Sequence, residues 1–369
     1  MGGARFVQKN LNERVVEAGE GGVKVPRARR GFAPPMWYRP PPMRAVRCHE
    51  LIGPAGLRVD EIPDPIAGPG EVVIDVHAMG VNFPDVLVTY GRYQFKADPP
   101  FVPGGELAGV VSAVGDGVTG LAQGDRVAAT MLSGAFAERV AVAAPMVSKL
   151  PASVPFETGA ALLLTYATTM HALVDRGRLR EGETLLVLGA AGGVGTAALE
   201  VGKCLGARVI AAASTPEKLA YCREHGADAV IDYKTEDLKD RAKALSGGGV
   251  NVIYDAVGGD ATEAALRAMA WGGRHLVIGF ASGSIPKVPA NLLLLKSCDL
   301  VGVFWGAFAQ RSPAENRAHI DRLLAWLVEG RIHPHVDAIL PFSRAREALE
   351  RLERREVKGK MVLIPGPLG

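Results

Sequence analysis

Cysteine is scarce in this 369-residue sequence, and the few cysteines are not grouped. The chain has four, at Cys48, Cys204, Cys222 and Cys298, and no two of them have the C-x-x-C spacing of a metal or redox motif. This pattern excludes a disulfide framework and a cysteine-rich structural zinc site. It favours a reducing compartment, and we therefore expect a cytoplasmic protein.

Long hydrophobic runs and a strong excess of one charge are also missing. No stretch approaches 18 consecutive apolar residues, so no membrane span is expected. The net charge is +3, and residues 1–42, with eight arginines and lysines against three glutamates, account for more than all of it. The slightly acidic remainder gives no reason to expect a nucleic-acid partner. Residues 1–42 are rich in glycine and proline without an apolar signal core, so we expect a flexible extension before Met43.

The stretch LLVLGAAGGVGTAALEVGKCLG (185–206) has the features of a dinucleotide-binding turn. Its first four residues form the apolar pattern of a strand buried on both faces of a parallel sheet. A glycine-rich segment follows, and a helical pattern then runs to Gly206, where the helix is expected to end. Glycines permit close approach of a pyrophosphate, and a helix N-terminus attracts that anion. We therefore predict contacts to a dinucleotide from Gly192, Gly193, Val194 and Gly195.

The next apolar run (207–213) predicts a second strand, whose end should lie near the adenosine ribose. The residues at that end indicate which cofactor is preferred. An NAD site usually has an acidic residue there, about 20 residues after the glycines. This chain has the segment STPEK (214–218), with no acid at the strand end itself and with Lys218 one helical turn on. A lysine in place of an acid suits a 2′-phosphate, so we expect NADPH. The alternative for Lys218 is a solvated helix residue.

The order of the remaining patterns predicts an α/β fold. Short strands punctuated by glycines are expected from Met43 to Met131, which is typical of an antiparallel, barrel-like domain. A helical pattern covers 156–173, and strands then alternate with other segments to about residue 308, as in a doubly wound parallel sheet. Its later strands are expected at 229–233, 250–255, 275–280 and 300–305. Two helices (314–329 and 344–354) and a last strand (359–364) follow.

Seven motifs, taken in order, make the chain from Met43 onward resemble the zinc-independent quinone oxidoreductases of the medium-chain dehydrogenase/reductase superfamily. They are VNFPDVLVTYGRYQ (81–94), PFVPGGELAGVVSAVG (100–115), GDRVAA (124–129), GAFAERV (134–140), AAGGVG (190–195), YDAVGG (254–259) and VKGKMVL (357–363). The resemblance implies a Rossmann domain (166–309) and a discontinuous, mostly β, GroES-like catalytic domain (43–165 and 310–369). Substrate would bind in the cleft between them.

The same resemblance bears on catalytic zinc. The zinc alcohol dehydrogenases have a cysteine ligand at the position of Asn82 and a histidine ligand at the position of Gly105. Neither residue here is a usual zinc ligand, and the lobe with four closely spaced cysteines is missing. We therefore expect no metal, and an acceptor that takes hydride without a Lewis acid, such as a quinone or an activated alkene.

The resemblance suggests Asn82 and Tyr93 as catalytic residues, because the matching positions lie at the mouth of the cleft. Asn82 would donate from its amide, and Tyr93 from its phenol, to the acceptor oxygen. The alternatives are a turn-stabilising asparagine and a packed tyrosine. Another family tyrosine position falls on Leu87 here. Asp85 is expected to be a local capping residue rather than a general base.

Further cofactor contacts follow from the same resemblance. Three positions match residues around the 2′-phosphate: Ser214, Lys218 and Tyr233. Thr168 matches a threonine near the nicotinamide, and Phe280 and Phe304 are either backbone contacts near that ring or simple core residues. Lys358 and Lys360 match a basic C-terminal region that can reach the phosphates, and Lys360 is the favoured contact.

The function implied by the resemblance is NADPH-dependent hydride transfer to quinones or activated carbonyl compounds. Two alternatives stay open: an enoyl or alkenal reductase on the same fold, and an NADPH-binding protein that is not an enzyme. The apolar run LVGVFW (300–305) predicts an exposed sheet edge, which pairing with a second copy would cover. We therefore expect a homodimer with a small-molecule substrate and neither a nucleic-acid nor a membrane partner.

Overall fold

The structure is a computed structural model that describes residues 42–366. The predicted N-terminal extension, except for Pro42, lies outside the described residues. Between residues 42 and 366, none of the helices combines the length and apolar character that crossing a lipid bilayer requires.

A six-stranded parallel sheet carries the glycine-rich turn, as the sequence predicts. Its strands follow the order β10-β9-β8-β11-β12-β13. From β8 the chain adds β9 and β10 on one side, and it then returns to add β11, β12 and β13 on the other side. This is the doubly wound order in which ligands bind at the carboxyl ends of the strands near the reversal. The strands are β8 (Thr184–Leu188), β9 (Arg208–Ala213), β10 (Ala229–Asp232), β11 (Val250–Asp255), β12 (Met269–Val277) and β13 (Asp299–Gly302).

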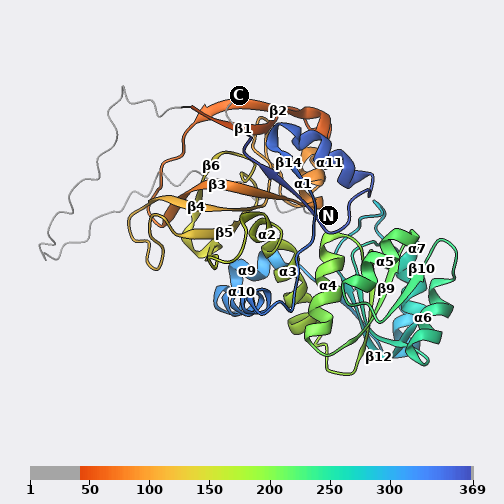
Figure 1. Ribbon diagram of the computed structural model, residues 1–369. Coiled ribbons are helices and arrows are strands. Elements are labelled where there is room, and N and C mark those ends of the chain that lie inside the picture. The colour runs from red at the N-terminus through yellow and green to blue at the C-terminus, as the bar shows by residue number, and fades with distance from the viewer. Residues whose placement is uncertain (1–41, 367–369) are drawn as a thin grey trace, which may run out of the picture. The chain divides into compact units, whose positions relative to one another are not determined.

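Helices connect these parallel strands, and Figure 1 shows α4, α5, α6 and α7 around β9, β10 and β12. The helix after the glycine-rich turn is α4 (Gly193–Cys204), and Gly206, with φ of +79°, takes the left-handed backbone that ends it, so this prediction is confirmed. The other helices of this part are α5 (Pro216–Glu224), α6 (Leu238–Ser246), α7 (Asp260–Arg267) and α8 (Ala290–Lys296).

A second sheet contains strands from both ends of the described chain. Its order is β14-β15-β3-β4-β5-β7, and β6 also pairs with β3. The C-terminal strand β15 (Lys360–Ile364) runs antiparallel to β3 (Glu71–Val81). The other strands are β4 (Glu106–Val114), β5 (Arg126–Thr130), β6 (Arg139–Ala143), β7 (Val147–Lys149) and β14 (Val336–Pro341), while β1 (Pro42–Cys48) and β2 (Leu57–Pro63) form a separate hairpin.

Several elements differ in their bounds from the expected ones. The predicted strand at 300–305 is too long, because β13 ends at Gly302 and Trp305 begins α9 (Trp305–Arg311). The predicted helix at 156–173 is instead α2 (Phe156–Ala160), α3 (Leu163–Met170) and a π-helical segment (His171–Arg176). The remaining helices are α1 (Phe83–Thr89), α10 (Pro313–Val328), α11 (Ala345–Glu353) and short 3₁₀ turns at Pro54–Gly56, Ala144–Met146 and Phe342–Arg344.

Candidate active site

The glycine-rich turn is shaped for close approach to a diphosphate. A Cβ added at Gly195 would lie 2.3 Å from the carbonyl oxygen of Gly189, so only glycine fits there. Gly192 caps α4 in extended conformation, and Gly193 begins the helix. The first N–H groups of a helix have no partner within it and attract anions. The turn therefore fits the pyrophosphate of a nicotinamide dinucleotide.

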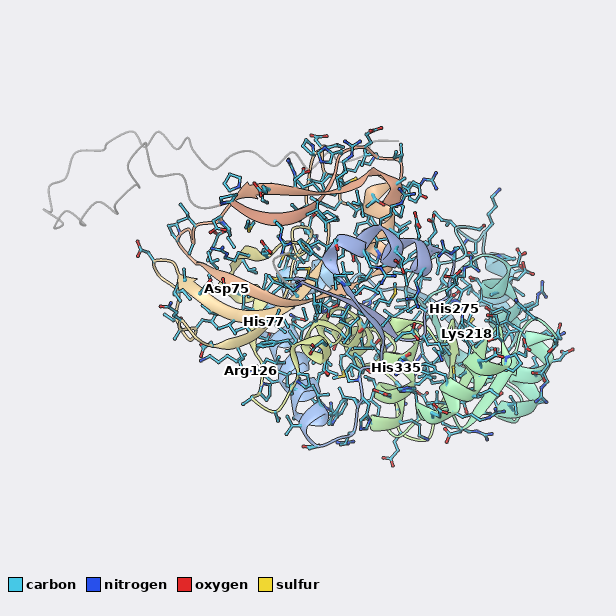
Figure 2. The ribbon with its side chains drawn as sticks, turned by 45° about the horizontal axis from the view of Figure 1, so that its top comes forward. Asp75, His77, Arg126, Lys218, His275 and His335 are labelled. Carbon is cyan, nitrogen blue, oxygen red and sulfur yellow. The ribbon has the colours of Figure 1, made fainter. Side chains whose placement is uncertain are left out.

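The segment after β9 gathers the residues expected near the adenosine ribose. Thr215 caps α5 by accepting a hydrogen bond from the backbone N–H of Lys218, at 3.3 Å. The backbone N–H of Tyr233 donates to Ala213, 3.3 Å away, which places Tyr233 beside Ser214. Figure 2 shows Lys218 among the helices of the parallel sheet. The structure thus brings Ser214, Lys218 and Tyr233 together.

The sequence analysis missed a second cation in this region, Arg355. The Lys218 ammonium donates to the backbone carbonyl of Arg355, 2.6 Å away, although the two residues are 137 positions apart. Burial lowers the pKa of Lys218, and the charges of Arg355 and Lys234 lower it further. These cations repel one another, so an anion bound beside them would be electrostatically favoured. Arg355 follows α11 with φ of +60°, an unusual backbone for arginine that no sequence pattern reveals.

The second part of the site is built where three strand ends meet. Asn82 follows β3, Glu106 begins β4 and Lys360 begins β15. Met361 pairs with Val81 across the sheet, so Lys360 comes opposite Asn82. The Lys360 ammonium donates to Asn82 Oδ1 at 2.5 Å and to Glu106 Oε2 at 3.0 Å.

Both hydrogens of the Asn82 amide have partners inside this cluster. Nδ2 donates to the carbonyl of Gly80 and to Glu106 Oε2, each at 3.2 Å. Asn82 is also only 4% exposed. The amide expected to donate to the acceptor is therefore engaged in holding Glu106 and Lys360, and Asn82 as a direct donor stays a prediction.

Asp85 and Tyr93 are the two titratable groups beside this cluster. Asp85 Oδ2 accepts a hydrogen bond from the backbone N–H of Asn82, 2.8 Å away, which gives it the local capping geometry expected at the start of α1. Burial, together with the charge of Glu106, raises the pKa of Asp85 to about 7 against the lowering effects of Asn82 and Lys360. Burial and the charge of Asp85 raise the pKa of Tyr93. Tyr93 therefore keeps its proton at neutral pH and can donate it.

Three residues expected near the nicotinamide lie on separate elements. Thr168 is half-buried on α3, one turn after Thr165. The methyl carbon of Thr165 lies beside the glycine-rich turn, because a Cβ added at Gly193 would be 3.1 Å from it. Phe280, just beyond β12, leaves no room for a side chain at Gly258, because its ring lies 2.8 Å from that Cβ position. Phe304 precedes α9 and is 56% exposed, which does not fit a simple core role.

The positions that correspond to zinc ligands have other partners. Asn82 is bonded to an ammonium, and a Cβ at Gly105 would lie 3.3 Å from the Met131 carbonyl. Within residues 42–366 there is no group of three or more histidine, cysteine or acidic side chains arranged to hold a metal ion.

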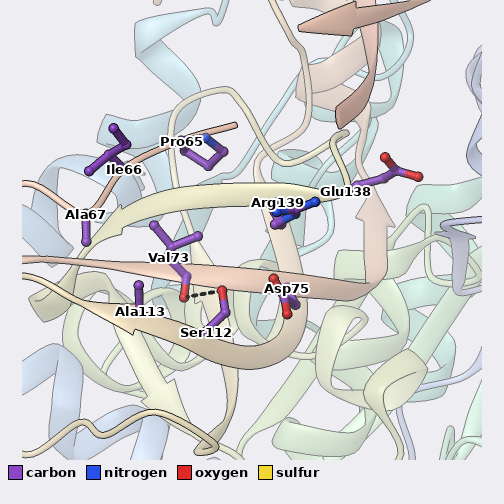
Figure 3. Close-up of a pocket in the computed structure, with 9 residues that line it drawn as sticks. All are labelled: Pro65, Ile66, Ala67, Val73, Asp75, Ser112, Ala113, Glu138 and Arg139. Carbon is purple, nitrogen blue, oxygen red and sulfur yellow. Dashed lines mark hydrogen bonds between the residues drawn. The ribbon is translucent and has the colours of Figure 1, made fainter. Parts of the chain in front are cut away.

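Two cavities lie away from the predicted residues. The larger, about 490 Å³, is an open depression on β3, β4 and β6, where Ser112 Oγ donates to the Val73 carbonyl at 3.4 Å (Figure 3). The smaller, about 250 Å³, has Glu200 and His225 in its wall. Neither wall includes a residue predicted to contact cofactor or acceptor.

Comparison with known proteins identifies both parts of the chain. The family model described as "Alcohol dehydrogenase GroES-like domain" matches residues 68–152, and the one described as "Zinc-binding dehydrogenase" matches residues 193–324. A "Quinone oxidoreductase-like protein 2 homolog" from Nematostella vectensis is 40% identical over 324 residues, which span 87% of this chain and 88% of the relative.

Two solved structures with similar folds contain the cofactor. The quinone oxidoreductase of Escherichia coli complexed with NADPH has a TM-score of 0.81 and 30% identity, covering 87% of this chain and all of that one. A mycobacterial protein complexed with NADPH has a TM-score of 0.83 and 34% identity, covering 88% of this chain and all of that one. These relatives and the glycine-rich turn support a nicotinamide cofactor.

Proposed function

We propose that this chain, which belongs to the quinone oxidoreductase family of the medium-chain dehydrogenase/reductase superfamily, uses NADPH to reduce its substrate. The proposed substrates are quinones or activated carbonyl compounds, and the reaction needs no zinc. The observation that supports NADPH is the pair of positive charges, Lys218 and Arg355, near the end of β9, where the sequence has Ser214 rather than an acidic residue. NADPH, when bound, supplies the hydride.

The protein's contribution is to bind and orient the reactants and to hold a proton. The backbone of Gly192, Gly193 and Gly195 would hold the pyrophosphate, and Lys218 and Arg355 would hold the 2′-phosphate. Tyr93 is protonated at neutral pH and donates to the acceptor oxygen, with Asp85 beside it. This arrangement suits an acceptor that needs orientation and a hydrogen bond more than a Lewis acid.

The proposal is tested by measuring NADPH and NADH oxidation with an ortho-quinone, a para-quinone and a 2-alkenal, each with and without a chelator. We expect quinone turnover that prefers NADPH and resists the chelator. Turnover confined to the alkenal would instead identify an alkene reductase. NADPH binding without any turnover would favour the non-enzymatic alternative, and loss of activity with the chelator would contradict zinc independence.

We also propose a homodimer, formed by pairing of β13 with its symmetry mate. β13 is an edge of the parallel sheet, and Leu300 on it is 40% exposed. Leu294 and Leu295 on the preceding helix are 77% and 63% exposed, an apolar surface that a partner would cover.

Light scattering at micromolar concentration should give the mass of two chains, and Leu294→Glu should shift it toward one, because a buried charge disfavours the interface. Leu132→Glu, at an exposed leucine outside the parallel sheet, is the matched control and should leave the mass unchanged. A one-chain mass for the unaltered protein would contradict the dimer.

The domain boundaries and the location remain proposals. We place the cofactor domain at residues 166–309 and the catalytic domain at 43–165 and 310–369. The return of β15 to the side of β3 supports a discontinuous catalytic domain. The four free cysteines support a reducing, cytoplasmic location.

A further inference from the structure

The buried Lys360–Glu106 ion pair is the feature of the site that the proposed function does not use. The side chains of Lys360 and Glu106 are 4% and 0% exposed, and their charged atoms are 3.0 Å apart. Burying two charges costs free energy unless each charge is well hydrogen-bonded, so a buried pair is weak evidence for a role in stability alone. Glu106 is held firmly, because its other oxygen accepts from the backbone N–H of Leu164 at 2.9 Å.

The lysine side chain also passes along the glycine-rich turn. Its Cδ lies 3.1 Å from the place of a Cβ at Gly193, the first residue of α4. The backbone N–H of Gly359 donates to Ala191 at 2.8 Å, which ties the chain just before Lys360 to the same turn. The ammonium is two bonds beyond Cδ and is bonded to Asn82 and Glu106, so the Lys360 side chain runs from the turn to that pair.

This position places two positive groups next to each other. The N-terminus of a helix carries a partial positive charge, which repels a neighbouring ammonium. Glu106 offsets both charges. A pyrophosphate bound at the turn would be a second anion within reach of the same ammonium.

We propose that Glu106 and the pyrophosphate of the cofactor compete for the Lys360 ammonium, so that Glu106 lowers the affinity for NADPH and binding loosens Lys360 from Asn82. This inference rests on the proposed function, because it places the pyrophosphate at the turn. Lys360 would be a cofactor-binding residue, whereas Glu106 would be a positioning residue that acts through it. A ligand that draws Lys360 away would also free the Asn82 carbonyl oxygen to interact elsewhere.

The test is the NADPH dissociation constant of charge variants, followed by cofactor fluorescence, with the NADPH-induced rise in Tm as a second readout. Lys360→Gln should weaken binding about 10-fold, since it removes a charged contact to a phosphate. Glu106→Gln should tighten binding by about 10-fold, because a neutral amide holds the ammonium less strongly than a carboxylate does. The rise in Tm with NADPH should be larger for Glu106→Gln than for the unaltered protein.

Asn82→Asp gives an independent arm if Glu106→Gln does not fold. It adds a second carboxylate beside Lys360, and we expect weaker NADPH binding. The matched controls are Lys149→Gln and Asp125→Asn, which neutralise an exposed lysine–aspartate pair with 2.9 Å between the charged atoms in the same sheet region. They should leave the dissociation constant unchanged.

The signs of these effects separate the possible failures. Weaker binding in Glu106→Gln as well as in Lys360→Gln would overturn the competition and indicate a purely structural ion pair. Unchanged or tighter binding in Asn82→Asp would overturn it as well. Absence of NADPH binding by the unaltered protein would overturn the proposed function itself.

Discussion

Replacement of Lys218 by alanine should raise the NADPH Michaelis constant about 10- to 100-fold and leave that for NADH nearly unchanged. A charged hydrogen bond to a phosphate contributes about 1.5–3 kcal/mol, and NADH has no 2′-phosphate. Replacement of Arg355 by alanine should also raise the NADPH Michaelis constant, because it removes a positive charge close enough to Lys218 to lower the pKa of that lysine. Steady-state kinetics with both cofactors at a saturating quinone concentration measures the effect.

Comparing NADPH with NADH distinguishes the loss of a 2′-phosphate contact from a general loosening of the fold. Lys218 also ties α5 to the segment after α11, so a general loosening would change NADPH and NADH kinetics alike. Equal effects on both cofactors would therefore contradict the 2′-phosphate assignment. Lys239→Ala, which removes a lysine from α6 that pairs with Asp240, is the matched control and should change neither constant.

Gly195→Ala should weaken NADPH binding about 100-fold and lower the free energy of unfolding by about 1–3 kcal/mol. The new Cβ would lie 2.3 Å from the Gly189 oxygen and 2.7 Å from backbone atoms of Ala190, so the turn must shift. A shifted turn no longer directs its N–H groups at the pyrophosphate. Chemical denaturation measures the stability, and fluorescence titration measures the binding.

The control for folding is Gly192→Ala in the same turn. There a Cβ would meet only the Gly189 oxygen, at an ordinary 3.5 Å, and the φ of −82° is accessible to alanine. Its unfolding free energy should be close to that of the unaltered protein. Comparable losses of stability in both variants would show that the close approach at Gly195 is not what the fold depends on.

Local patterns in the sequence were sufficient for the glycine-rich turn and the two elements that it joins. An unbroken apolar run predicted the buried strand β8, and a glycine-rich segment followed by helical spacing predicted the turn and α4. These features depend on neighbours within about 20 residues, where apolar periodicity and glycine placement carry the information. The strand at 300–305 was wrong beyond Gly302, since an apolar run alone does not distinguish a strand from the start of a helix.

The sequence by itself therefore predicted the fold class, the glycine-rich turn and the serine, rather than an acid, at the end of β9. Only the tertiary structure decided which distant side chains meet. Lys360 reaches Asn82 across 278 positions because β15 pairs with β3, and Lys218 reaches Arg355 across 137. Such contacts are set by strand register and chain return, which no local pattern encodes. The sequence predicts the amide of Asn82 as a donor to the acceptor. In the folded protein that amide donates to Gly80 and Glu106 instead, because strand pairing brings these groups to it.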